Sequence, residues 1–360
     1  MSGSPQNITR DNHYLPEFLL RQWASEGKIF LYRILVSAPT VPEWQQRPTS
    51  SVGFRDDLYT LLSGGREVDE FEKWTQAIET PAATSIHKLT LGSKVTPQDW
   101  RNIIKLVALQ DLRTPQGFLE LRKLWDRIIP DALNKSMEEA IEHLESAHAR
   151  GERLPERTEG PDPIGRLVRI EIEPPDQLGS DKAKVRATVP SGRHLWLETV
   201  RNLMENGAKV LFTHRWSVAA PFGDLQWPLP DHPVIRLNWN SESDYNFGGG
   251  WNSPGTEIMM PLSPQHLLYV KVGAKMRNRF TFGQKATQLL QRLLAERAHR
   301  FIFATRKEEW VATARPRTVD ADAMAAEERE WREWHQDQLA SETALEQRPA
   351  LLRRQPNGDF

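Results

Sequence analysis

Cysteine is absent from this chain of 360 residues. Its absence excludes disulfides, thiolate metal sites and a cysteine nucleophile. No apolar run approaches the roughly 18 residues that a membrane-spanning helix needs, and the first residues contain no apolar core of a signal peptide. We therefore expect a cytoplasmic protein that contacts no membrane.

An excess of charge of one sign is also missing. The 47 Lys and Arg residues almost balance the 48 Asp and Glu residues, so no global basic field indicates nucleic-acid binding, and only a local basic patch is compatible with it. With 39% hydrophobic and 26% charged residues, the composition is that of a globular protein and excludes a wholly disordered chain.

The first region, residues 1–150, is predicted to be helical after a short strand. Residues 15–23 have the pattern of a short helix, 28–35 alternate as a strand, and the proline-containing stretch 37–57 is predicted to be a loop. From residue 69 onward the apolar spacing is helical.

Three helix starts are predicted within that helical stretch. Asp69, Thr96 and Ser136 each precede an acidic residue by three positions, which is the pattern of an N-terminal cap with a carboxylate in the first turn.

The second region, residues 165–310, follows a Gly- and Pro-containing linker at 150–164 and mixes strands with helices. Because the two kinds of element do not alternate strictly, we predict an α+β fold with a mixed sheet in this region. A charged helical tail is predicted over 316–360, with a frayed end from residue 347. The predicted strands are 166–172, 209–216, 233–238, 256–261, 267–273 and 301–304, and the predicted helices are 193–206, 282–297 and 320–345.

Motifs of well-known catalytic sites are not found. The sequence has no HExxH, no Gly-x-Ser-x-Gly elbow and no phosphate-binding glycine loop. Pro230-Asp231 supplies half of a restriction-nuclease motif, but the acid-x-lysine half occurs only at Glu26-Gly27-Lys28. We expect no metal site, and we interpret Gly248–Gly250 as a flexible turn or a mobile flap.

Thirteen tryptophans are more than a chain of this length usually has. We assign to the core those at apolar-face positions, which are Trp23, Trp74, Trp100, Trp125 and Trp196. A loop-rich stretch holds better candidates for a lined cleft, namely Trp216, Trp227, Trp239 and Trp251. Trp331 and Trp334 lie one helical turn apart in the tail and would dock it onto the body or onto a partner.

One segment is distinctive. Residues 12–23 (NHYLPEFLLRQW) resemble the HYxPxFxLRxF opening of the bacterial domain-of-unknown-function family 4238. Further segments follow in the family's order. Residues 57–59 (DLY) precede an acidic helix that contains 78–79 (IE). Then 110–115 (QDLRTP) is similar to Q-x-x-R-T-P, 231–234 (DHPV) is similar to D-N-P-V, and 261–264 (PLSP) matches P-L-S-P. The resemblance covers roughly residues 11 to 305.

This resemblance implies a role but no established activity. Members of the family occur among candidate phage-defence genes, which implies an effector or toxin that stops the infected cell. The leading hypothesis is a nuclease that acts on RNA or DNA. The alternative is a non-enzymatic sensor or binding module that recognises a phage component and acts through a partner. No cofactor and no oligomeric state are indicated.

The matched polar residues predict a site. His13 can transfer protons near neutral pH. Gln110 and Arg113 lie three positions apart on one helical face, and a guanidinium fork suits a phosphate or a carboxylate. Asp231 would orient the histidine or bind a cation. The alternative is a structural cluster in which the same groups brace the fold. The predicted catalytic residues are His13, Gln110, Arg113 and Asp231, and the predicted substrate-binding residues are Tyr14, Arg21, Trp227 and Trp239.

Overall fold

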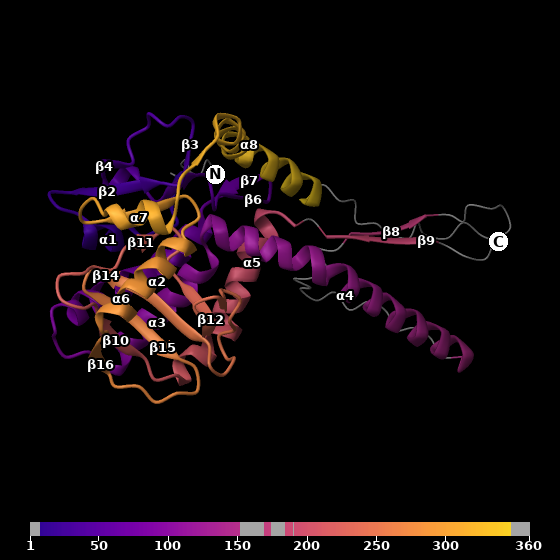
Figure 1. The fold of residues 1–360 in the computed structure, drawn as a ribbon. Helices are drawn as coiled ribbons and strands as arrows, with labels where there is room; N and C mark the ends of the chain where they lie inside the picture. Colours follow the sequence, from indigo (N-terminus) through magenta and orange to yellow (C-terminus); the bar gives the residue numbers. More distant parts are fainter. Residues whose placement is uncertain (1–7, 152–168, 174–183, 190, 347–360) are drawn as a thin grey trace, which may run out of the picture.

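The computed structural model describes residues 8–151, 169–173, 184–189 and 191–346. Its fold is α+β, as predicted (Figure 1). The α-helices are α1 Glu17–Leu20, α2 Glu70–Thr90, α3 Pro97–Leu112, α4 Pro115–Ala149, α5 Arg193–Asn202, α6 Gln284–Arg297, α7 Glu309–Ala314 and α8 Ala321–Glu346. The strands are β1 Asp11–His13, β2 Lys28–Arg33, β3 Leu35–Val36, β4 Trp44–Pro48, β5 Phe54–Asp56, β6 Leu61–Ser63, β7 Arg66–Val68, β8 Arg169–Glu173, β9 Lys184–Thr188, β10 Ser217–Ala220, β11 Leu229–Pro230, β12 Ile235–Ser241, β13 Asp244–Asn246, β14 Glu257–Ser263, β15 His266–Lys271, β16 Arg279–Thr281, β17 Phe301–Ala304 and β18 Thr318–Val319.

A six-stranded mixed sheet forms the second half of the chain. Its order is β13-β12-β14-β15-β10-β16, and β16 pairs parallel to β10 while the other pairs are antiparallel. Successive side chains of β14 enter different cores: Met259 packs with Leu293 of α6, whereas Ile258 belongs to the cluster that contains Leu106 of α3. This alternation follows from the two-residue period of a strand, and it makes the sheet the middle layer between α6 and α3.

A four-stranded sheet joins the two ends of the chain. Its order is β11-β17-β2-β4, and Leu31 of β2 lies opposite Phe303 of β17. The predicted buried strand at 301–304 is therefore confirmed, and residues from both predicted regions share one sheet and one large core.

Of the three predicted helix starts, the one at Thr96 is confirmed together with its cap. Thr96 accepts the backbone N–H of Asp99 at 3.1 Å, and the Asp99 carboxylate accepts the backbone N–H of Thr96 at 2.9 Å, which completes a capping box. Asp69 stands at the N-cap of α2, but its carboxylate binds the Thr9 N–H and Lys73 instead of the helix end.

Three predictions about elements were wrong. No helix begins at Ser136, because α4 runs unbroken through it on a sequence rich in Leu, Glu and Ala, all strong helix formers. Residues 208–213 form a 3-10 helix, and the strand begins only at Ser217. The stretch 37–57 contains β4 and β5, because β4 hydrogen bonds to the free side of β2. Most of the predicted linker and the predicted frayed end lie outside the described residues.

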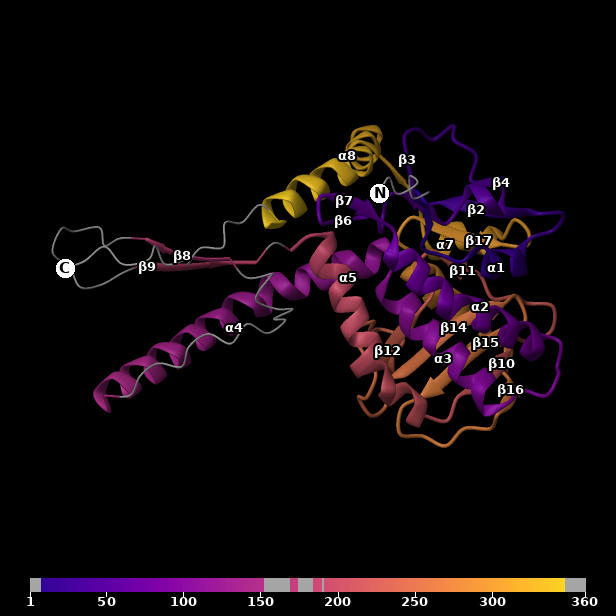
Figure 2. The same ribbon diagram turned by 180° about the vertical axis from the view of Figure 1, so that it is seen from behind.

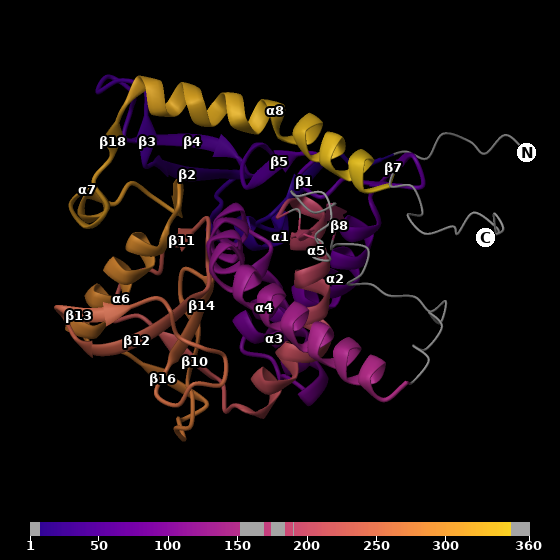
Figure 3. The ribbon, with the colours of Figure 1, turned by 90° about the vertical axis from the view of Figure 1, so that its right-hand side faces the viewer.

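The tail helix α8 packs on the body of the molecule (Figure 3). Trp334 contacts Phe118 edge-on, with ring centroids 5.2 Å apart. The Arg193 guanidinium donates to both carboxylate oxygens of Glu342 at 2.9 Å, and both side chains are buried. In contrast, α4 and the β8–β9 hairpin extend away from the rest of the molecule (Figure 2). Among the described residues, no helix is both long enough and apolar enough to cross a membrane.

Candidate active site

Arg113 is the centre of a buried polar cluster between α2 and α3. It ends α3, its side chain is fully buried, and its Nη2 forms an ion pair with Glu79 of α2. Its backbone carbonyl accepts the Tyr59 hydroxyl at 2.7 Å. The Glu79 carboxylate that faces this guanidinium offsets the cost of burying its charge.

Gln110 holds Arg113 from the other side. With its amide oxygen oriented toward the guanidinium, Gln110 accepts from Nη2 at 2.7 Å and from Nε at 2.9 Å, and its NH₂ donates to the Tyr14 carbonyl at 3.0 Å. This orientation is assigned from the hydrogen-bond partners, because it places the amide oxygen against guanidinium donors and the amide nitrogen against a carbonyl. The predicted residues Gln110 and Arg113 therefore meet, and they meet next to the His13-Tyr14 segment.

His13 lies at the outer side of this cluster. Its imidazole is half-buried and stands 5.5 Å from the Phe54 ring. Burial lowers the pKa of His13 below its ordinary 6.5, and Arg113 lowers it further, whereas the negative charges of Glu17 and Glu79 oppose the change. The histidine is therefore neutral at pH 7.

Two nitrogen atoms of this cluster have no hydrogen-bond partner within the described part of the chain. They are Nε2 of His13 and Nη1 of Arg113, and both are buried. Buried polar atoms nearly always have a hydrogen-bond partner, so two nitrogen atoms without one in the same cluster require an explanation. A water or a ligand at each nitrogen would supply its missing partner.

Glu72 adds a second carboxyl to the cluster, about two turns before Glu79 on α2. Asn12 donates to it at 3.4 Å, and burial raises the pKa of Glu72 to about 7. The Asn12 amide oxygen accepts the backbone N–H of Tyr59 at 3.0 Å, which ties the first motif to the residues before α2.

The raised pKa of Glu72 predicts a pH dependence of stability. Between about 4.5, the ordinary pKa, and about 7, the folded protein holds a proton that the unfolded chain has released, so the free energy of unfolding falls as pH rises through this range. Glu72→Gln cannot ionise, so its free energy of unfolding relative to the wild type should rise by about 3 kcal/mol from pH 4.5 to above pH 7. Urea unfolding at several pH values measures this. Exposed Glu70→Gln is the control, and an equal change in it would contradict the assignment.

With the cluster described, its residues can be compared with known proteins. A family model described as "Protein of unknown function (DUF4238)" matches residues 11–308. The chain belongs to the DUF4238 family. The matched span begins at β1, contains the whole His13 cluster and ends before α8, so the tail helix lies outside the family region. Comparison with curated proteins and with solved structures gave no match.

The DHPV segment of this DUF4238 chain lies in a different environment from His13. Asp231 is buried, and its carboxylate accepts the backbone N–H groups of His299 at 2.7 Å, Arg300 at 2.8 Å and Phe301 at 3.1 Å. Burial raises the pKa of Asp231 to about 6, although these three donors oppose the rise. Asp231 forms no hydrogen bond with His13, and its contacts are those of a residue that fixes the start of β17.

His232, which replaces the asparagine of the DUF4238 motif, joins that motif to Q-x-x-R-T-P. Its Nε2 accepts from Arg297, which is always a donor, so Nδ1 carries the proton and donates to the hydroxyl of Thr114. Arg297 in turn donates to both carboxylate oxygens of Glu120, at 2.7 and 3.0 Å. The two family motifs therefore converge in this network. His232, Thr114 and Arg297 are buried in it and hydrogen-bonded, whereas Glu120 is partly exposed.

The predicted substrate-binding residues are scattered. Tyr14 and Trp227 are buried in the core, where a substrate has no access to their rings. Trp239 stacks on Tyr245 with centroids 5.5 Å apart, far along the chain on the β12–β13 hairpin. Arg21 is exposed and pairs with Glu17 at 2.9 Å, which places it on the His13 side of the molecule.

The tryptophans divide less cleanly than predicted. Trp23, Trp125 and Trp196 are buried, whereas the other two assigned to the core, Trp74 and Trp100, are partly buried. Of the remaining cleft candidates, Trp216 is buried, and Trp251 is partly buried and donates to Asp111 at 2.8 Å.

Sequence reasoning did not select Glu79 and Glu72 as site residues. Glu79 lies in an Ile-Glu segment that the family resemblance already marks, and this signal would have found it. Glu72 was interpreted as a helix-cap carboxylate, and only the fold shows that it points to Asn12 instead. Within the residues that the structure describes, no group of three or more His, Asp or Glu side chains is arranged to hold a metal ion.

The predicted glycine flap is firmly held at its middle residue. Gly249 is buried, its N–H donates to the Arg236 carbonyl at 3.1 Å, and a Cβ there would lie 2.4 Å from Cγ2 of Thr256. Gly249→Ala should therefore lower the free energy of unfolding by about 1–3 kcal/mol through overpacking, measured in urea. Gly283→Ala, whose Cβ meets open space, is the control. Equal stability of the two variants would contradict a close-packed Gly249.

Proposed function

We propose that this protein is a phage-defence effector that hydrolyses phosphodiester bonds in RNA or DNA, with His13 as the residue that transfers the proton. The observation that supports this most directly is the unpaired, buried Nε2 of a neutral histidine beside Glu79 and Arg113. A neutral imidazole nitrogen without a partner is what a general base requires, because it can accept a proton from an attacking water. Since Nε2 is buried, water and substrate reach it only when the side chains around it move apart.

In the proposed reaction, His13 removes a proton from water as the oxygen attacks phosphorus. The phosphorus bond to the leaving oxygen then breaks, and the protonated histidine returns the proton to that oxygen. Glu79, whose side chain is partly exposed, stabilises the imidazolium that forms in between.

Arg113 is a positioning residue in this proposal: it holds Glu79 and does not contact the substrate. It is fully buried and paired with Glu79 and Gln110, so a phosphate reaches it only if Glu79 moves aside. We therefore replace the expected role of Arg113 as a phosphate ligand with that of fixing Glu79. We give Asp231 no part in the chemistry, because three backbone N–H groups occupy its carboxylate.

The test is direct. The purified chain is incubated with tRNA, mRNA and plasmid DNA, with and without divalent metal, and the products are separated on gels. Cleavage of at least one substrate is expected. Intact substrates under all these conditions would contradict the nuclease proposal.

A sensor or binding module is the second candidate. It is favoured by the partly exposed, stacked pair of Trp239 and Tyr245, which offers an aromatic surface to a partner. The tail gives it less support, because Trp334 is buried against Phe118 and Trp331 packs against Trp334 with its ring tilted by 50°. A binding module should tolerate His13→Ala and lose partner capture with Trp239→Ala, which is the reverse of what an enzyme should do.

A further inference from the structure

Acidic residues are absent from one long stretch of this nearly neutral chain. Residues 258–295 contain no Asp or Glu, although the chain as a whole has as many acids as bases. The same stretch carries the cations Lys271, Lys275, Arg277, Arg279, Lys285 and Arg292. The overall charge therefore conceals a strongly basic segment.

Two of these cations are neutralised from outside the stretch. Lys271 pairs with Glu257 at 3.0 Å, and Arg292 pairs with Glu296 at 3.3 Å. In the part of the chain that the structure describes, Lys275, Arg277 and Arg279 form no ion pair, and all three are exposed. They lie in the β15–β16 connection and in β16, the edge strand of the six-stranded sheet.

Two further segments bring cations to the same edge. Val218 of β10 lies opposite Arg279 and donates its N–H to the Asn278 carbonyl at 2.9 Å, so exposed Arg215, three residues before Val218, lies beside this edge. The Arg279 guanidinium donates to the Leu89 carbonyl at 3.1 Å, which places the end of α2 and exposed Lys94 there too. We call this surface the basic edge; it consists of Lys94, Arg215, Lys275, Arg277 and Arg279.

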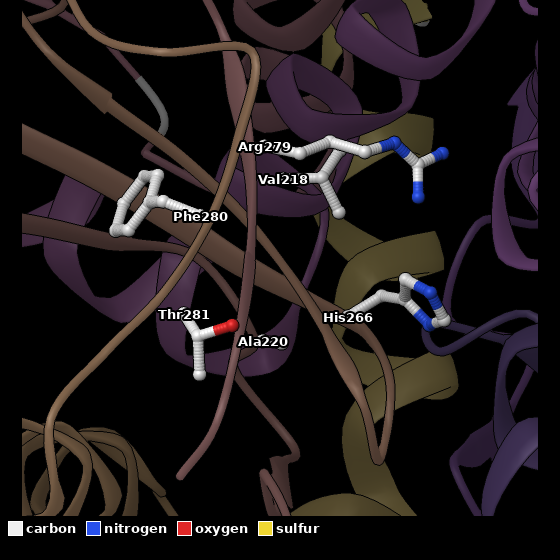
Figure 4. A pocket seen from close by; sticks show the side chains of 6 residues that line it. All are labelled: Val218, Ala220, His266, Arg279, Phe280 and Thr281. Carbon is white, nitrogen blue, oxygen red and sulfur yellow. The ribbon is translucent and has the colours of Figure 1, made fainter.

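A cavity of about 330 Å³ opens on the basic edge between β10 and β16. Figure 4 shows the side chains of Arg279 and His266 extending to the same side, and Thr281 lies farther along β16, the strand of Arg279. Its volume lies within the range of about 300–1,000 Å³ that small-ligand pockets occupy. It therefore combines a guanidinium, an imidazole and a hydroxyl around space for a group the size of a nucleotide.

We propose that the basic edge binds the phosphate backbone of single-stranded nucleic acid. The proposal deepens the proposed function and rests on it for the identity of the polyanion. Helix α2 connects the two sites: ten residues, about 15 Å of helix, separate Glu79 in the His13 cluster from Leu89 at the basic edge. A strand bound at the edge would have to extend about 15 Å along α2 to reach Glu79 beside the proton-transferring group.

The experiment measures binding without cleavage. The full chain carrying His13→Ala is titrated into a fluorescein-labelled oligouridine of about 20 nucleotides, longer than most single-strand binding sites. Fluorescence anisotropy is recorded between about 50 and 200 mM salt. Lys275→Glu/Arg277→Glu, added to this variant, should weaken binding at least ~10-fold at low salt. The double change should also reduce the slope of log K against log salt by about 1.4, because each lost phosphate contact contributes about 0.7.

The matched control reverses two exposed cations of α4. Arg122→Glu/Lys123→Glu changes the net charge by the same amount and should leave the affinity unchanged. Equal weakening by both double changes, or no binding by the parent, would overturn the proposal. Capture by phosphatidylserine vesicles but not by oligouridine would overturn it too. Because cleavage is measured separately with wild-type protein, binding without cleavage contradicts only the proposed nuclease activity.

Discussion

His13→Ala is expected to lower phosphodiester cleavage at least ~100-fold, the usual contribution of a general acid or base, and to abolish protection against phage. The change removes an imidazole whose Nε2 has no partner in the described structure, so it leaves no buried group newly unpaired. The free energy of unfolding should therefore change by less than about 1 kcal/mol. Cleavage assays, phage challenge and thermal melting of the purified variant together measure the effect.

The pH profile supplies an independent check on the same residue. Because burial lowers the pKa of His13 below 6.5, the cleavage rate should rise with pH through an apparent pKa below that value and level off at neutral pH. His143→Ala, on the exposed side of α4, should behave as wild type. A His13→Ala variant that melts several degrees lower and has no other defect would show a structural role instead.

Arg113→Met is expected to lower the free energy of unfolding by about 3–5 kcal/mol, the cost of leaving one partner of a buried ion pair behind. The methionine fills much of the space of the side chain, but it leaves the Glu79 carboxylate without its counter-charge and Gln110 without its donors. Urea unfolding measures the loss.

The control for this prediction is an arginine at the surface. Arg21→Met removes an exposed pair with Glu17 and should cost no more than about 1 kcal/mol. The double variant Arg113→Met/Glu79→Leu should recover part of the stability, because it removes the unpaired carboxylate as well. A loss for Arg113→Met no larger than that for Arg21→Met would contradict the buried-pair interpretation.

Local signals predicted the elements whose pattern is contained in the segment itself. The Thr96 cap depends on neighbours in sequence and was predicted correctly. The strand at Phe301–Ala304 was predicted from its own apolar residues, although its pairing partner β2 lies far away in the sequence. The segment before Ser217 was predicted as a strand from its apolar residues alone. It winds into a 3-10 helix that packs on α3, a contact that no local pattern contains.

The candidate site was predicted only in part, because the family resemblance marks residues but not the contacts that these residues make in the fold. The family resemblance placed His13, Gln110 and Arg113 together, and they share one cluster. It also marked Asp231, whose environment depends on a chain reversal near residue 300 that brings three N–H groups onto its carboxylate. The basic edge could not be predicted from the net charge, because the net charge averages over the whole chain. The edge exists because one stretch of the chain contains no acidic residues.

The pairing of β2 with β17 affects how the protein is made on the ribosome. Residue 301 is synthesised long after residue 33. One side of the β2 backbone therefore has no pairing strand until most of the chain has left the ribosome. Such distant pairing slows folding and exposes the edge to aggregation meanwhile. The core that holds Tyr14 and Leu31 also closes late. A chain cut short before Phe301 would lack the partner strand, so an incomplete copy of this protein would not carry an assembled site.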